Sequence, residues 1–227
     1  MTDRPILFSA PMVRGLIREV ERDGTGKTQT RRLGNLDMLN DDPTRYSFIG
    51  IVGDKPHFSF RDLQTGHEVQ IPCRIVKGDR LYVREHWRTE SKAYDDLKPS
   101  EMDADYSVIF EADGDWKANK TVGRFRQGMH MPRWASRLTL TVTDVRVQRL
   151  QEISREDAKA EGFPVDHLGN YYEPPPPEKD SWQGYAVASF CLTWSKLNGP
   201  GSWDANPWIV ALTFTVERRN IDAARAA

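Results

Sequence analysis

The sequence predicts an α+β, mainly β protein, in which a β-barrel or strongly bent sheet carries short flanking helices. Several short segments alternate between apolar and polar residues, a pattern that is typical of half-buried strands. These segments do not alternate regularly with helices, as they would in a parallel α/β sheet, so a closed or curved sheet is favoured. With 227 residues, 38% of them hydrophobic, the chain can bury one core, and we expect a single domain over residues 1–220.

The N-terminal part contains a short strand and an amphipathic helix. Residues 5–9 form a short apolar segment that we predict as a strand, and residues 11–22 carry apolar side chains at helical spacing. The proline at the start of the second segment suits a first helical turn, and Gly24 and Gly26 end the helix. Residues 35–54 show no periodic pattern, so we expect irregular structure there.

The central and C-terminal segments supply the remaining strands. Residues 57–60 and 68–71 alternate in the manner of a β-hairpin, with residues 65–66 near its turn. β-Branched and aromatic residues favour further strands in four segments, which are residues 80–85, 106–110, 138–147 and 208–216.

Two helices and an insert complete the predicted organisation. Residues 154–162 begin with a serine that suits an N-cap and end with a glycine that suits helix termination. Residues 186–197 carry apolar side chains at helical spacing, which predicts a helix packed on the core. The proline-rich residues 164–186 cannot hold a regular ladder, so we expect a solvated loop excursion there. We expect residues 221–227 to form a disordered tail.

Composition argues for a soluble cytoplasmic protein without cofactor or metal. No apolar run approaches the length of a membrane span, and the N-terminus lacks the pattern of a signal peptide. Cys73 and Cys191 lie in apolar surroundings far apart in the sequence, so we expect reduced core cysteines. The five histidines are scattered without ligand spacing, which gives no indication of a zinc site.

The charge distribution favours a small or single-stranded anionic ligand. The formal net charge is only -1, which argues against a protein that coats nucleic acid by bulk electrostatics. Basic residues nevertheless concentrate in residues 14–32, 84–88 and 124–149, whereas acidic residues collect in residues 95–115 and 173–180. A basic cleft on a neutral protein suits a nucleoside or single strand better than a long duplex.

The segment Gly-Lys-Thr-Gln-Thr-Arg-Arg at residues 26–32 is the strongest candidate for a functional site. It places three cations and two hydroxyl groups in seven residues directly after the first predicted helix. A phosphate-binding P-loop would need a glycine where Glu21 stands, and it would follow a strand instead of a helix. The segment therefore does not indicate a nucleoside triphosphatase.

The same segment resembles the signature of the ASCH domain, a relative of the PUA domain, which has the form Gly-x-Lys-x-x-(Glu/Thr)-x-Arg. Lys27, Thr30 and Arg32 occupy its lysine, variable polar and arginine positions, while Thr25 stands where the glycine is expected. Residues 77–87, 131–137 and 198–208 are similar to segments of the larger phage and bacterial members, so the resemblance covers about residues 5–217. It implies a PUA-like barrel.

The resemblance also implies a set of catalytic residues. In the members that hydrolyse N4-acetylcytidine, a lysine and a threonine of the signature act with a glutamate beyond a helix, and Glu161 is the best match here. Lys27 could serve as a base if burial or neighbouring cations lower its pKa, with Thr30 as nucleophile and Glu161 in proton transfer. In a regular strand Lys27 and Thr30 would point to opposite faces, so the backbone must bend between them. An exposed Glu161, unfavourably placed at a helix C-terminus, is the alternative.

A non-catalytic module that binds RNA or another single strand is the second hypothesis. Cations of the signature would bind phosphate, RNA being favoured over DNA, and rim aromatics beside arginines would stack on bases. Asn206 precedes a proline, so we expect it to be extended and to present its amide to a base. The predicted ligand-binding residues are Arg32, Arg84, Glu85, Trp87, Arg133, Trp134, Arg137, Asn206 and Trp208.

Two further interpretations compete with this binding surface. About half of the four tryptophans at residues 87, 134, 203 and 208 would be core residues, because large aromatic side chains are usually buried. The arginines could form internal salt bridges with Glu85, Asp79 or Asp144 and only stabilise the barrel. A third possible function is that of an accessory protein that binds another protein through its proline-rich insert.

Overall fold

A computed structural model describes residues 2–114, 116, 119–163 and 179–223. Its centre is a five-stranded sheet with the order β1-β6-β9-β10-β2, in which only the β1–β6 pair is parallel. These strands are β1 (Asp3–Leu7), β2 (Gln29–Arg32), β6 (Arg80–Arg84), β9 (Thr139–Arg149) and β10 (Trp208–Glu217).

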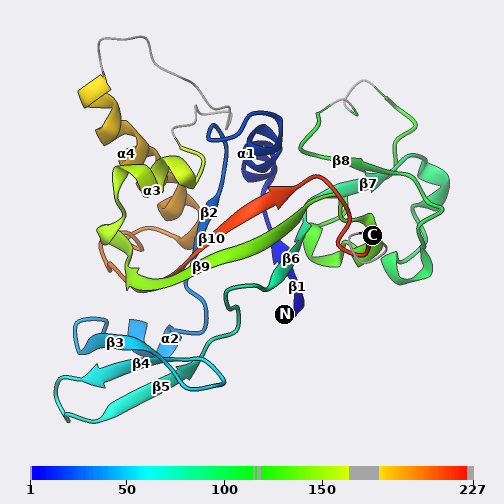
Figure 1. Ribbon diagram of the computed structural model, residues 1–227. Coiled ribbons are helices and arrows are strands. Elements are labelled where there is room, and N and C mark those ends of the chain that lie inside the picture. Colours follow the sequence, from blue (N-terminus) through cyan, green and yellow to red (C-terminus); the bar gives the residue numbers. More distant parts are fainter. Residues whose placement is uncertain (1, 115, 117–118, 164–178, 224–227) are drawn as a thin grey trace.

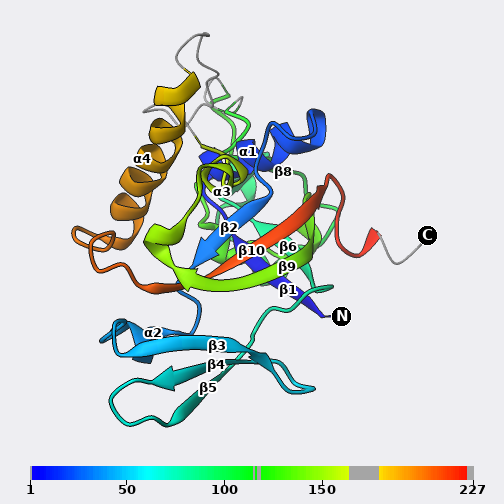
Figure 2. The same ribbon diagram turned by 60° about the vertical axis from the view of Figure 1, so that its left-hand side comes forward.

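Two smaller sheets accompany the central one. The first, in the order β3-β4-β5, lies below the central sheet in both Figure 1 and Figure 2. Its strands are β3 (Tyr46–Val52), β4 (His57–Asp62) and β5 (Glu68–Pro72). The second is the pair β7 (Trp87–Thr89) and β8 (Val108–Phe110), on the side away from α3 and α4 (Figure 1).

The helices are α1 (Ala10–Glu21), α2 (Asp37–Asn40), α3 (Arg155–Ala160) and α4 (Lys179–Asn198). Short 3₁₀ turns occur at Lys92–Tyr94, Pro99–Glu101, Gly128–His130, Arg133–Ala135 and Leu150–Glu152. None of the helices within the described residues is long and apolar enough to cross a membrane. The mixed α+β class, dominated by sheets, is thus confirmed.

The central sheet is open, which differs from the closed barrel that the sequence led us to expect. Its edges are β1 and β2, which pair with β6 and β10 and not with each other. Helix α1 connects the two edge strands and packs against β10, so the connection crosses a face of the sheet instead of closing it. The long strands β9 and β10 bend, with a register shift between Thr213 and Phe214.

Strand β10 is buried on both faces and separates two parts of the core. Val210 and Leu212 belong to the larger cluster, which includes α1 residues and joins the central sheet to β4. Ile209 and Ala211, on the other face, belong to a second cluster beneath α3 and α4. Burial on both faces explains why this strand is a nearly continuous apolar run.

Most predicted elements are confirmed to within a few residues. The irregular structure expected over residues 35–54 is wrong, because α2 and β3 lie there. Strand β3 alternates in burial, but apolar Ile49 and Ile51 occupy its exposed face, so no polar alternation marks it in the sequence. Helix α4 begins at Lys179, inside the expected loop excursion 164–186, whose residues 164–178 lie outside the described part of the chain.

The end of the chain is partly packed. The predicted disordered tail covers residues 221–227, of which 224–227 lie outside the described residues. Ile221 is buried, and its carbonyl oxygen accepts a hydrogen bond of 2.7 Å from Arg80. This contact fixes the beginning of the tail against β6.

Candidate active site

A cavity of about 440 Å³ opens beside the ends of β1 and β2, a volume typical of small-molecule sites. The segment of residues 7–34 forms one part of its wall. His86 after β6, the residues that follow α3, and α4 form the rest. The lining residues are Leu7, Phe8, Ser9, Met12, Lys27, Thr30, Arg31, Arg32, Leu33, Gly34, His86, Glu161, Phe163, Phe190, Thr193, Trp194, Leu197 and Asn198.

A buried carboxylate shared by two cations lies in the wall of this cavity. Lys27 Nζ donates to Glu161 Oε2 at 2.5 Å and to the Glu161 carbonyl oxygen at 2.9 Å. Arg31 donates to the other carboxylate oxygen, Oε1, at 3.2 Å. The side chains of Lys27 and Glu161 are only 1% and 4% exposed, so solvent screens this contact little.

A second carboxylate holds Arg31 in place. Arg31 Nη2 lies 2.7 Å from Asp157 Oδ2. Arg146 donates to the other oxygen of the same carboxylate, Asp157 Oδ1, at 2.9 Å. Burial acts to raise the pKa of Asp157, but the hydrogen bond from Arg146 and the charge of Arg31 outweigh it and lower the pKa. Asp157 is therefore an anion at neutral pH, and it leaves Arg31 little freedom to move.

Arg32 is the third cation of the cavity and carries no carboxylate partner among the described residues. It donates to the Leu7 carbonyl oxygen at 2.8 Å, and its guanidinium lies 5.0 Å from the ring centroid of Phe8. Burial lowers its pKa. Among the described residues, Glu161 is the one lining carboxylate that faces Lys27, Arg31 and Arg32. Arg31 also pairs with Asp157, so the described lining carries an excess of positive charge when all these groups are ionised.

Three glycines make room for Lys27 between α1 and α3. A Cβ atom on Gly15 would lie 3.2 Å from Lys27 Cβ, and one on Gly162 would lie 3.4 Å from it. A Cβ atom on Gly26 would lie 2.4 Å from the Gly15 carbonyl oxygen. Gly162 also has a φ of +93°, a conformation that other residues rarely adopt. The stem of Lys27 is therefore enclosed by main chain.

The bend that the sequence required between Lys27 and Thr30 is present. Lys27 precedes β2, and its N–H donates to Gly15 of α1, while the N–H of Thr28 donates to Ala160 of α3. Thr30 lies within β2, opposite Leu212, and is almost fully buried. Lys27, Thr30 and Glu161 all line the cavity, as expected.

Burial lowers the pKa of Lys27. The negative charge of Glu161 and its hydrogen bond act in the opposite direction, and the positive charges of Arg32 and Arg31 lower the pKa further. A lysine with a lowered pKa can act as a proton acceptor nearer to neutral pH than an exposed lysine. The alternative of an exposed Glu161 is wrong, since its residue is only 3% exposed.

The predicted arginine and glutamate rim does not gather at this cavity; of the nine predicted ligand-binding residues only Arg32 lines it. Arg137 donates to both carboxylate oxygens of Glu85, at 2.9 and 3.0 Å, and Glu85 is buried. Arg133 pairs with Asp3 and Asp222, both at 2.6 Å. Arg84 donates to a main-chain carbonyl oxygen, at Met129, and borders a separate hollow.

These arginines therefore form internal contacts, as expected from the alternative interpretation in which they only stabilise the fold. Their partners differ in part from that alternative, because Asp79 and Asp144 contact Arg4 and Arg146. Sequence cannot show which acidic residue an arginine meets when the two lie more than fifty residues apart.

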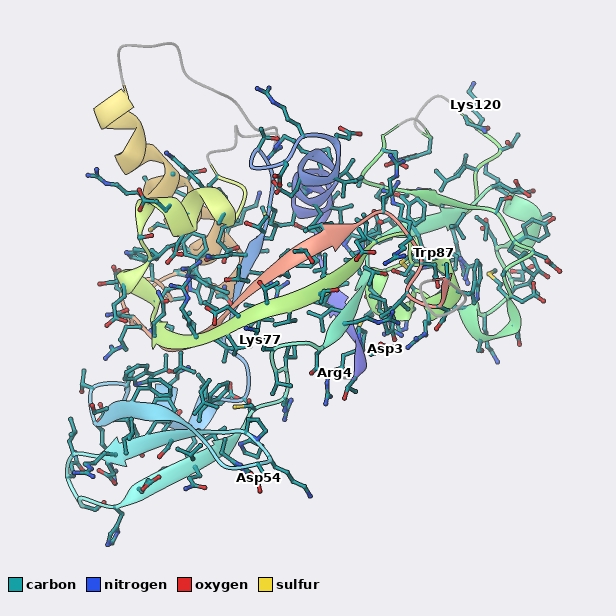
Figure 3. The ribbon with its side chains drawn as sticks, viewed as in Figure 1. Asp3, Arg4, Asp54, Lys77, Trp87 and Lys120 are labelled. Atoms are coloured by element: carbon teal, nitrogen blue, oxygen red, sulfur yellow. The ribbon has the colours of Figure 1, made fainter. Side chains whose placement is uncertain are left out.

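The predicted aromatic residues of the rim serve packing. Trp87 is fully buried and is the first residue of β7, on the side away from α3 and α4 (Figure 3). The indole N–H of Trp134 donates to Met102, and that of Trp208 donates to Pro43.

Asn206 does not present its amide to the cavity. Its φ is +43°, so the extended conformation expected before a proline is wrong. Asparagine tolerates this left-handed region better than most residues. Its side-chain oxygen accepts the N–H of Gln151 at 2.8 Å, which joins two segments that lie 55 residues apart in the sequence.

Several lining residues were missed by the sequence reasoning. Helical spacing predicts Phe190 and Trp194 as core residues, and they do pack in the core, but they also form a cavity wall. Their spacing of four residues shows a shared helix face but not what that face meets. His86 lies in the segment 77–87 that resembles the family, but nothing in its position indicated a role.

The described residues contain no group of three His, Cys, Asp or Glu side chains suited to a metal ion. Cys73 and Cys191 are both free thiols, and burial raises the pKa of Cys73 to about 11. No family model matches this chain, and comparisons with curated proteins and with solved structures gave no match.

Proposed function

We propose that this protein hydrolyses the amide of an acylated nucleoside such as N4-acetylcytidine. The observation that carries the proposal is the 2.5 Å contact between Lys27 Nζ and Glu161 Oε2 in the wall of a cavity that Thr30 also lines. The residue order of the resemblance supports assignment to the ASCH group of PUA-like proteins, and in its members that hydrolyse N4-acetylcytidine these three positions act together.

In the proposed reaction, the neutral amine of Lys27 takes the proton of the Thr30 hydroxyl while Thr30 Oγ1 attacks the acyl carbon. The tetrahedral intermediate collapses with cleavage of the C–N bond, and the ammonium of Lys27 returns the proton to the leaving amine. Water then cleaves the acyl-threonine ester, with Lys27 as base again. Glu161 orients Nζ and stabilises the ammonium that forms in each half of the reaction.

The rest of the cavity suits a planar and partly anionic ligand. Phe8, Phe190 and Trp194 provide aromatic walls against which a base can pack. Arg32 has no carboxylate partner among the described side chains and is able to pair with a phosphate. Nucleotides and single-stranded RNA therefore belong to the proposed substrate class together with nucleosides.

Recognition of a single strand without catalysis is the second candidate. This candidate is favoured by the ion pairs of Lys27 and Arg31, since both cations already have carboxylate partners, Glu161 and Asp157. Such a set can simply stabilise the fold and leave Arg32 to contact phosphate.

A matched pair of threonine variants separates the two functions. Purified protein is incubated with N4-acetylcytidine, and the release of cytidine is followed by chromatography. Thr30→Val should abolish release, whereas Thr193→Val removes the same hydroxyl from another wall of the cavity and should leave release intact. Mass spectrometry of quenched wild-type reactions should locate one acyl group on Thr30.

The enzyme proposal is rejected if wild-type protein turns over no acylated nucleoside. Salt-sensitive binding of single-stranded RNA by the same preparation would then support the recognition function.

A further inference from the structure

His86 is a lining residue whose ring is fixed by contacts outside the cavity. Its carbonyl oxygen accepts the N–H of Glu111 at 3.0 Å, and its ring packs against Phe125 with centroids 5.0 Å apart. Its Nδ1 atom lies 3.0 Å from the main-chain nitrogen of Gly128. One hydrogen bond thus fixes the backbone of His86, and two contacts, with Phe125 and with Gly128, fix its ring.

The contact with Gly128 determines where the neutral imidazole carries its proton. A main-chain N–H can only donate, so Nδ1 of His86 must be the unprotonated acceptor. The proton of the neutral ring then resides on Nε2. Nε2 has no hydrogen-bond partner within the described part of the chain, and His86 is one of the residues that line the cavity. His86 therefore offers a neutral N–H donor to a ligand.

A glycine is required for this arrangement. A Cβ atom on Gly128 would lie 2.7 Å from Leu7 Cδ1 and 2.9 Å from the carbonyl carbon of Glu85. Any larger residue would push the segment away from the end of β1 and from His86. The close approach that sets the proton position is thus built into the main chain.

The other side-chain nitrogen donors of the cavity are committed or charged, apart from the indole N–H of Trp194, which is buried and has no hydrogen-bond partner among the described residues. Lys27 and Arg31 donate to Glu161, and the side-chain amide of Asn198 donates to the Trp194 carbonyl oxygen. Arg32 has donors to spare, and the proposed function assigns them to a phosphate of the ligand. Hydroxyl groups rotate and are not fixed donors. The reacting groups proposed above include none that would stabilise the oxygen of the tetrahedral intermediate.

We infer that the Nε2–H group of His86 donates a hydrogen bond to the acyl oxygen and stabilises the oxyanion that forms there. The inference rests on the proposed amide hydrolysis. When Thr30 attacks, the carbonyl electron pair moves onto the oxygen, and it returns when the C–N bond breaks, so His86 transfers no proton. A donor that is already oriented stabilises this charge without reorganisation during the reaction.

Two amide variants test this role, because each reproduces one ring nitrogen. In His86→Asn the side-chain oxygen can accept the Gly128 N–H in place of Nδ1, but no donor reaches the cavity. In His86→Gln the amide nitrogen reaches the position of Nε2. We expect His86→Asn to lower kcat for N4-acetylcytidine about 100- to 1,000-fold with KM changed less than about threefold, and His86→Gln to restore much of the loss.

Binding of the product cytidine is the control, since it lacks the acyl oxygen. Its affinity should be the same for wild-type protein and both variants, and thermal unfolding should confirm that both variants fold. An equal loss of kcat and of cytidine affinity would place the hydrogen bond on the base and overturn the inference. An unchanged kcat in His86→Asn would overturn it as well, while leaving the proposed hydrolysis standing.

Nitrogen NMR of labelled protein examines the proton position without turnover. The His86 ring, assigned by its loss in His86→Asn, should show a protonated Nε2 and an unprotonated Nδ1 near neutral pH. A proton on Nδ1 would refute the inference even if the wild-type enzyme is active. Failure of wild-type protein to cleave any acylated nucleoside would instead remove the reaction itself, and with it the oxyanion.

Discussion

Replacing Glu161 by glutamine tests whether the cavity wall contains a desolvated ion pair. The substitution keeps the shape of the side chain and one oxygen acceptor, but it removes the charge that faces Lys27 and Arg31. Lys27 is then left as an almost fully buried cation without a carboxylate partner. Arg31 keeps its contact with Asp157.

The expected cost follows from the burial of both partners. Removing one member of a buried ion pair destabilises a protein by about 3–5 kcal/mol, because the other charge remains desolvated. For a chain of this length that corresponds to a fall in Tm of roughly 6–20 °C. The double variant Lys27→Met/Glu161→Gln should regain most of this loss, since it removes both charges of the pair.

The effect should depend on pH in a definite direction. The pKa of Lys27 is lowered in the folded protein, so between that value and its ordinary value of 10.5 the unfolded chain binds more protons than the folded one. Stability contributed by Lys27 therefore rises with pH in this window. The deficit of Glu161→Gln should be smaller at about pH 9.5 than at about pH 7, and Lys27→Met should abolish the difference.

Denaturant unfolding of wild-type protein, Glu161→Gln, Lys27→Met and the double variant at both pH values provides the measurement. Glu217→Gln is the control, because Glu217 pairs with Arg219 on the surface and should cost at most about 1 kcal/mol. A loss below about 1 kcal/mol for Glu161→Gln would show that the pair is hydrated. A double variant no more stable than Glu161→Gln would equally refute the argument from desolvation.

Three further outcomes are expected. Arg137→Ala should lower the free energy of unfolding in denaturant by about 3–5 kcal/mol, because it leaves Glu85 buried without its partner. The affinity for N4-acetylcytidine should not change, and weakened binding would restore the rim hypothesis. Gly26→Ala should lower both stability, by about 1–3 kcal/mol or more, and turnover, because its Cβ would lie 2.3 Å from the Glu19 nitrogen; unaltered kinetics would contradict the close packing. Cys73, with its pKa raised to about 11, should react with iodoacetamide at about pH 8 much more slowly in folded than in unfolded protein, and equal labelling rates by mass spectrometry would contradict its burial.

Local patterns identified most of the secondary structure but few of the tertiary contacts. The helix cap at Ser154 was recognisable because its side chain bonds to an N–H three residues later. Strand β3 was not, because its apolar residues lie on both faces. An exposed apolar face gives no periodic signal, so this strand could be recognised only through its pairing with β4.

The candidate site was partly accessible from the sequence. The family resemblance indicated Lys27 and Thr30. Glu161 was indicated by its position, because the helix dipole disfavours an acidic residue at the C-terminal end of a helix. The structure gives the physical reason, since two cations compensate that position. The prediction of a ligand-binding rim at this cavity is wrong because Arg133 and Arg137 pair with carboxylates that are distant in sequence. No local pattern reveals such pairs.

The separation of Lys27 and Glu161 by 134 residues also has a consequence for the order of folding. Among the described strands β2 pairs with β10 alone, so during synthesis the basic segment around Thr30 has no described strand partner until β10 leaves the ribosome. Contacts between such distant segments form slowly, because a long loop must close first. The hairpin of β4 and β5 can form early, whereas the described lining of the cavity is completed only when Asn198 has been synthesised. A chain that stalls before β10 would therefore present Lys27, Arg31 and Arg32 to solvent, and binding of an anion would report directly on how far folding has advanced.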